Sequence, residues 1–129
     1  MIECNAYFQR EDECNYWKEQ NILMDAWSPL AAGKEDLFTN EILCEIAQKH
    51  QKSVAQIILR WLVKRGIVPV VKSANPIRMR ENLDIFDFAL SEDEMEQITS
   101  LDTGHTYATA RNTGKAVTEF LEKANQYHV

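Results

Sequence analysis

Three short apolar segments, separated by stretches with helical periodicity, constrain the fold of this chain most strongly. They lie at residues 2–5, 22–27 and 67–71. Strands that alternate with helices favour a parallel sheet joined by right-handed crossovers. The sequence therefore predicts an α/β fold with three parallel strands.

Helix signals lie between and after these segments. Apolar spacing predicts helices at 11–20, 40–50, 54–64 and 92–101, and a last helix at 115–127 after a polar loop. Ser53 with Gln56, and Ser91 with Glu94, have the spacing of capping boxes. Gly66 suits a left-handed helix end. We expect Trp17 to face inward in its helix.

The sequence also predicts which of several other residues are buried and which face solvent. In the helix at 54–64 we expect Gln56 to face solvent, opposite the apolar residues. The apolar residues of the connector 86–90 are expected to pack against neighbouring helices. Pro69 lies inside the third strand and has no backbone N–H to donate to a neighbouring strand. We therefore expect it at a position where no neighbouring strand needs that hydrogen bond.

The predicted sheet is small for the number of helices. A parallel sheet of three strands has two open edges and needs cover on both faces. Several of the helices are apolar enough to cover more sheet than three strands provide. This imbalance indicates that part of the sheet is missing.

Composition and charge narrow the possible partners. The chain has 129 residues, 45% of them hydrophobic, which suits one small globular domain. A net charge of −6 argues against nonspecific nucleic-acid binding. We expect no membrane span and no signal peptide. Cys4, Cys14 and Cys44 show no metal-binding spacing, so we expect reduced thiols, a cytoplasmic location and no metal site.

The segment 71–82 is the strongest candidate for a binding site. It follows the third strand and opens a helix with Asn75 as N-cap and Pro76 at the first helical position. Free N–H groups and the helix dipole favour an anion there, and Lys72 and Arg78 add positive charge. A phosphate grip and an ordinary solvated helix start both fit this pattern.

The segment from Ile2 to Leu101 resembles the C-terminal part of the aldo-keto reductase family. Its motifs match in order and spacing: Ile-Glu-Cys-Asn at 2–5 with Tyr7, Ala-Trp-Ser-Pro-Leu at 26–30, Ile46-Ala47, Ser53 to Gln56, Leu59 to Trp61, Arg65-Gly66, Lys72-Ser73, Arg78, Glu81-Asn82, Phe86 to Phe88 and Leu90-Ser91.

This resemblance implies a partial (β/α)8 TIM barrel. The chain would supply strands six to eight with their helices, plus extra helices. Residues 1–66 would hold strands six and seven, 67–101 strand eight and the cofactor-binding segment, and 102–129 a C-terminal loop and helix.

The resemblance implies NADPH as cofactor. Trp27 matches an aromatic residue that stacks on the nicotinamide, although a buried tryptophan at a strand end is the alternative. Ser28 and Leu30 match positions that contact the pyrophosphate.

The segment 71–82 then matches the adenosine side of the cofactor. Lys72 and Ser73 match residues that hold the 2′-phosphate, and Ala74 and Asn75 match residues that add contacts. Arg78 matches a residue that stacks on adenine and pairs with this phosphate, a double role that suits a planar guanidinium.

The resemblance also covers the residues that contact adenine and bears on the catalytic residues of the family. Glu81 and Asn82 match residues that hydrogen-bond adenine. The catalytic tyrosine, lysine, aspartate and histidine of the family lie on earlier strands, so we expect no catalytic residue here. Tyr7 is expected at the barrel rim, and His105 and Tyr107 match the region that sets substrate specificity.

Two functions follow from these expectations. The first is the NADPH-binding C-terminal part of a truncated aldo-keto reductase. The parent activity reduces aldehydes and ketones by hydride transfer, and the isolated chain is inactive unless the missing part is supplied. The alternative is a non-catalytic nucleotide-binding or assembly module that self-associates through its open sheet edges.

Overall fold

A three-stranded parallel sheet forms the centre of the chain. The computed structural model describes residues 1–33, 36–106, 118 and 121–122. The strands β1 (Ile2–Glu3), β2 (Met24–Trp27) and β3 (Ile67–Val70) lie in the order β1-β2-β3. Ala26 of β2 pairs with Ile2 on one side and with Pro69 on the other. This parallel arrangement confirms the predicted fold class.

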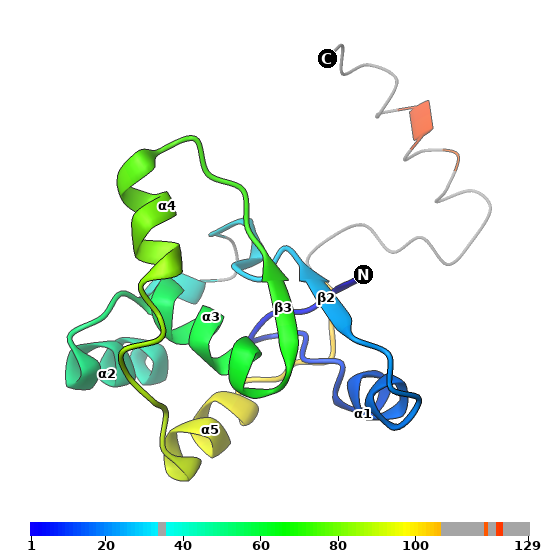
Figure 1. Cartoon of the computed structure of the whole chain (residues 1–129), viewed down its shortest axis with the longest axis horizontal. Coiled ribbons are helices and arrows are strands. Elements are labelled where there is room, and N and C mark those ends of the chain that lie inside the picture. Colours follow the sequence, from blue (N-terminus) through cyan, green and yellow to red (C-terminus); the bar gives the residue numbers. More distant parts are fainter. Residues whose placement is uncertain (34–35, 107–117, 119–120, 123–129) are drawn as a thin grey trace.

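Five helices surround the sheet in the described residues (Figure 1). The helix α3 packs on β3, α2 packs on α3, and α5 packs on α2. The helix α4 lies beyond the carboxyl end of β3, and α1 lies beside β2 toward the other end of the sheet (Figure 1). Their bounds are α1 Glu11–Glu19, α2 Glu41–His50, α3 Val54–Lys64, α4 Pro76–Leu83 and α5 Glu92–Thr99, with short 3-10 turns at Ala31–Gly33 and Leu37–Thr39.

Local capping signals set the helix ends as predicted. The Ser53 hydroxyl accepts a hydrogen bond from the Gln56 N–H, and the Gln56 side chain accepts one from the Ser53 N–H. Ser91 and Glu94 repeat this capping box at α5. Gly66 has a φ of +77°, the left-handed conformation that glycine adopts at low cost.

The core lies between α3 and the sheet. Helix α3 is apolar over most of its surface, and it supplies a group of buried side chains: Ile57, Ile58, Leu59, Trp61 and Leu62. Ala26 of β2 and Leu43 of α2 are completely buried against this cluster. The sheet therefore holds its position chiefly through α3.

Three side chains lie on a different side from the one predicted. Trp17 is 37% exposed, because α1 contributes only Cys14 to the core. Gln56 is buried, because its amide reaches backbone oxygens of α4. Phe86 is 70% exposed beneath the Arg60 guanidinium, whereas Leu90 of the same connector is buried as expected.

The strand ends also differ slightly from the prediction. The second strand begins at Met24, since Ile22 and Leu23 are exposed in the turn before it. Pro69 is tolerated because β3 pairs only with β2 among the described residues, so one side of the strand has no ladder.

The C-terminal predictions fall largely outside the described residues. Tyr107 and the rest of the polar loop after it are not described, nor is most of the helix expected at 115–127. Among the helices that the structure describes, none has the length and apolar character needed to cross a membrane.

Stability at low pH is expected to depend on Glu94. Its buried carboxylate lies 2.8 Å from His50 Nε2. Burial opposes the charge, but hydrogen bonds from the Ser91 N–H and from His50 outweigh burial and lower the pKa of Glu94. A lowered pKa stabilises the fold above the unfolded value of about 4.3, and this stabilisation disappears as the pH falls through the folded value.

We therefore expect Glu94→Gln, which preserves the capping box, to reduce stability at pH 7 and to make little difference near pH 3. Urea unfolding across this pH range measures the effect. The exposed Glu96 on the same helix provides the control variant Glu96→Gln. A Glu94→Gln deficit that stays constant down to pH 3 would contradict this account.

Candidate functional site

A cavity of about 780 Å³ opens at the carboxyl ends of β2 and β3. Its walls come from the loop after β2, the start of α3, the segment after β3 and one face of α4. The lining residues are Ser28, Pro29, Leu30, Ala32, Gly33, Phe38, Ser53, Val54, Ala55, Val70, Val71, Lys72, Ser73, Arg78, Glu81 and Asn82. Its volume is in the range of small-molecule and cofactor sites.

The cavity brings together most of the residues singled out from the sequence. Seven of them line it: Ser28, Leu30, Lys72, Ser73, Arg78, Glu81 and Asn82. Trp27, Ala74 and Asn75 do not line it. Trp27 is half-buried at the end of β2, Ala74 is exposed, and Asn75 caps α4. Two loops far apart in the sequence therefore meet at one site.

The sequence reasoning did not identify one wall of the cavity. Val54 and Ala55, in the first turn of α3, contribute an apolar surface between the two loops. Phe38 adds an aromatic ring from the segment before α2. The capping box at Ser53 marks the start of α3 in the sequence, but it does not show that this start faces a cavity.

The loop after β2 has an unusual backbone. Ser28, Ala31 and Ala32 have φ values of 52°, 49° and 52°, in the left-handed region that residues other than glycine seldom adopt. Gly33 follows with a φ of +72°, and a Cβ atom there would lie 3.3 Å from Phe38 Cε2. Such conformations concentrate at ligand-binding loops, where the surrounding structure holds them in place.

Helix α4 carries Arg78, Glu81 and Asn82 but buries none of its own residues. It is held by polar contacts at both ends. The Asn75 side chain accepts a hydrogen bond of 2.9 Å from the Ile77 N–H. At the other end, Gln56 Nε2 donates to the backbone oxygens of Glu81 at 3.0 Å and of Asp84 at 3.1 Å.

A lysine supports the same end of α4. Lys52 Nζ lies 3.2 Å from Asp84 Oδ2 and 2.9 Å from Asp87 Oδ1. The hydrogen bond with Lys52 lowers the pKa of Asp87, and the two carboxylates raise the pKa of Lys52. Gln56 and Lys52 thus connect the start of α3 to the end of α4.

The charges at the cavity favour an anionic ligand with a polar ring. Lys72 and Arg78 bring two positive charges to one side, in a chain whose net charge is −6. The Glu81 carboxylate and the Asn82 amide lie on the same helix as Arg78 and offer an acceptor and an amide. Phosphate oxygens and a heterocycle edge are the groups that such a set binds.

Tyr7 and His105, two residues singled out from the sequence, lie outside the cavity lining. The Tyr7 hydroxyl accepts a hydrogen bond of 3.2 Å from Asn40 Nδ2, so an amide is its described partner. His105 is exposed. Within the described ranges, no cluster of three histidine, cysteine, aspartate or glutamate side chains could hold a metal ion.

Comparisons with known proteins agree with this geometry. The family model described as "Aldo/keto reductase family" matches residues 2–103. The chain is 42% identical over 112 residues to aldose reductase B of Dictyostelium discoideum, covering 87% of this chain and 36% of that protein. It is 45% identical over 101 residues to glyoxal reductase of Bacillus subtilis, covering 78% of this chain and 36% of that protein.

Solved structures give the same result. The aldo-keto reductase MGS-M4 from a deep-sea metagenome library has a TM-score of 0.82 at 38% identity, covering 88% of this chain and 43% of that one. A mutant of Gox0644 in complex with NADPH has a TM-score of 0.77 at 33% identity, covering 85% of this chain and 41% of that one. The chain therefore spans about a third of the length of the curated relatives it matches.

Proposed function

This chain belongs to the aldo-keto reductase family, and we propose that its cavity binds the adenosine side of NADPH. The observation that carries this proposal is the convergence of Lys72, Ser73 and Arg78 with Ser28 and Leu30 around one cavity of about 780 Å³. A related structure, the Gox0644 mutant, holds NADPH. The donor set fits the group, since two cations face a space large enough for a nucleotide.

Each side chain has a proposed part in this site. Lys72 and Ser73 bind the 2′-phosphate, and Ala74 and Asn75 add backbone and side-chain contacts to the cofactor. Arg78 pairs with the phosphate while its plane lies on adenine. A 2′-phosphate distinguishes NADPH from NADH, so these contacts favour NADPH.

The rest of the cofactor has proposed contacts too. Glu81 and Asn82 hydrogen-bond the adenine edge, whereas Ser28 and Leu30 contact the pyrophosphate from the loop after β2. Trp27 lies half-buried at the end of β2, where its ring stacks on the nicotinamide.

The parent activity we propose is NADPH-dependent reduction of aldehydes or ketones by hydride transfer. Relatives bear the names aldose reductase, glyoxal reductase and methylglyoxal reductase. The chain corresponds to strands six to eight of the barrel, with residues 67–101 as the cofactor-binding segment. We propose that it does not reduce carbonyl compounds alone, because none of its tyrosines and histidines lies in a catalytic motif of the family.

Tryptophan fluorescence tests the cofactor proposal. NADPH is expected to quench the fluorescence of the chain at lower concentration than NADH does, and Trp27→Phe is expected to reduce the quenching. Trp17→Phe is the matched control, since Trp17 lies on α1, remote from the cavity lining. Equal quenching by both cofactors would contradict the 2′-phosphate site, and NADPH oxidation with an aldehyde would contradict the proposed inactivity.

A second candidate function is assembly, and the open edges of the sheet favour it. Among the described residues, β1 and β3 each pair with β2 alone, and Val68 and Val70 of β3 are 41% and 44% exposed. Unpaired strand edges recruit other strands. Sedimentation equilibrium is expected to show self-association, and a chain that stays monomeric at high concentration would contradict this candidate.

A further inference from the structure

Two of the cysteines lie together where the segment after β1 meets α1, and neither of them lines the cavity described above. Cys4 follows β1 and is completely buried, and Cys14 on α1 is 9% exposed. Both thiols donate to the same backbone oxygen, that of Gln9, at 3.3 Å from Cys4 Sγ and 3.9 Å from Cys14 Sγ. The fold therefore places the two thiols side by side around one acceptor.

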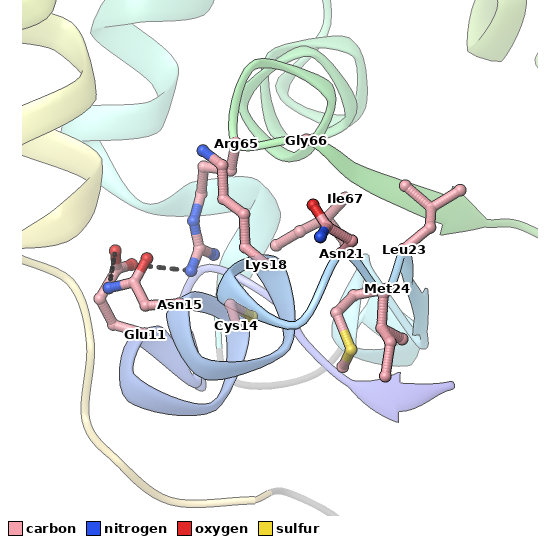
Figure 2. A pocket seen from close by; sticks show the side chains of 11 residues that line it. Glu11, Cys14, Asn15, Lys18, Asn21, Leu23, Met24, Arg65, Gly66 and Ile67 are labelled. Carbon is pink, nitrogen blue, oxygen red and sulfur yellow. Dashed lines mark hydrogen bonds and ion pairs between the residues drawn. The ribbon is translucent and has the colours of Figure 1, made fainter.

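A fixed positive charge lies beside the two thiols. Arg65, at the end of α3, points toward α1 (Figure 2). Its Nη1 lies 3.6 Å from Cys4 Sγ, and its Nη2 donates to the Gln9 oxygen at 3.0 Å and to Glu11 Oε2 at 2.8 Å. The guanidinium also stacks on the ring of Trp61, 4.6 Å from the ring centre. These contacts hold its charge at the thiol pair.

A second cavity gives access to only one of these thiols. It has a volume of about 390 Å³ and lies at the amino ends of β2 and β3. Cys14 lines it together with Arg65, Glu11 and Lys18 (Figure 2), whereas Cys4 is completely buried and does not line it. A small reagent that enters this cavity therefore meets Cys14 first.

The two thiols differ in acidity. The neighbouring Cys4 thiol and the charge of Arg65 outweigh burial and the nearby carboxylates of Glu11 and Glu13, and they lower the pKa of Cys14 to about 7. The neighbouring Cys14 thiol and burial raise the pKa of Cys4. Cys14 is the better nucleophile at neutral pH, because the thiolate is the reactive form.

We propose that Cys4 and Cys14 form a redox-reactive dithiol site that reduces small hydroperoxides and closes an intramolecular disulfide. The Cys14 thiolate attacks the terminal oxygen of the hydroperoxide, the O–O bond breaks, and the alkoxide leaves and takes up a proton. The Cys4 thiol then loses its proton and attacks the sulfur of the Cys14 sulfenic acid, and hydroxide leaves as water. Two thiols are oxidised, and one hydroperoxide becomes an alcohol and water.

Peptide mapping tests this proposal, because trypsin separates the two cysteines. Cleavage at Arg10 and Lys18 places Cys4 in the peptide 1–10 and Cys14 in the peptide 11–18, and Cys44 falls in the peptide 35–49. After treatment of the folded chain with hydrogen peroxide at pH 7, we expect 1–10 and 11–18 to remain linked until a reductant is added. The linkage is expected to form more slowly in a chain unfolded in urea, since unfolding separates Arg65 from the two thiols.

Variants assign the order of the steps. Cys14→Ser is expected to leave the peptide 1–10 reduced, and Cys4→Ser is expected to stop at a sulfenic acid on 11–18 that dimedone traps. Cys44→Ser is the matched control and is expected to form the linkage at the normal rate, because the Cys44 thiol donates to the Phe38 oxygen instead.

Two results would overturn the proposal. One is that the peptides 1–10 and 11–18 are not linked after peroxide treatment, although Cys44 has become oxidised. The other is linkage at the same rate in the folded and the urea-unfolded chain. If Cys4→Ser does not fold, as circular dichroism shows, early dimedone trapping on 11–18 of the unmodified chain replaces it, and the absence of trapping there contradicts the proposed order.

Discussion

Replacement of Arg78 by leucine is expected to weaken NADPH binding by about 2 kcal/mol, or roughly 30-fold, and to change NADH binding much less. Arg78 lies on the exposed helix α4 and lines the cavity at the carboxyl ends of β2 and β3. In the proposed site, the variant removes a charge-assisted hydrogen bond to the 2′-phosphate and a planar group against adenine. Calorimetric titration with both cofactors measures the two affinities.

Arg80→Leu is the matched control for this result. Arg80 lies on the same helix, is exposed and does not line the cavity. We expect it to change NADPH affinity by less than about threefold, since it contributes only through screened charge. Equal losses in Arg78→Leu and Arg80→Leu would show that the general charge of α4, and not a specific contact, determines binding.

Replacement of Gln56 by leucine is expected to destabilise the fold by about 2–3 kcal/mol, because three hydrogen bonds of a buried side chain are lost. The Gln56 amide donates to the backbone oxygens of Glu81 and Asp84 and accepts from the Ser53 N–H. Leucine keeps the volume but pairs with none of these groups. NADPH affinity is expected to fall as well, since α4 loses one of its two polar connections to the start of α3.

Gln48→Leu is the control for the loss of an amide. Gln48 is exposed on α2, and we expect its replacement to change the free energy of unfolding by less than about 0.5 kcal/mol. Urea unfolding measures both variants. A Gln56→Leu variant as stable as Gln48→Leu would contradict the role assigned to the amide.

The features predicted well from the sequence are those with local causes. The capping boxes at Ser53 and Ser91 and the glycine at 66 act through neighbours within three residues, so the sequence contains their partners. The order of strands and helices follows from periodicity, and the parallel sheet follows from that order.

The features missed depend on contacts distant in sequence. The Gln56 amide pairs with oxygens 25 and 28 residues away, so its burial has no local signal. Arg65 reaches Cys4 across 61 residues, and periodicity in α3 places Arg65 at a helix end without naming that neighbour. Distant contacts of this kind appear only when the elements are packed together.

The candidate site was predicted in part from the sequence. The motif resemblance named ten residues, and the structure places Lys72, Arg78 and five others around one cavity. The apolar wall at Val54 and Ala55 had no motif of its own and required the packing of α3 against the loop after β2. The cofactor contacts of these residues remain predictions.

The most direct test of the cofactor site uses only the adenosine half of the ligand. Adenosine 2′,5′-bisphosphate and 5′-AMP differ by the 2′-phosphate alone, so calorimetric titration of the chain with each isolates the part proposed for Lys72, Ser73 and Arg78. We predict that the bisphosphate binds about tenfold more tightly, with a difference that shrinks as salt is added. Equal affinities at low salt would contradict the proposed 2′-phosphate site.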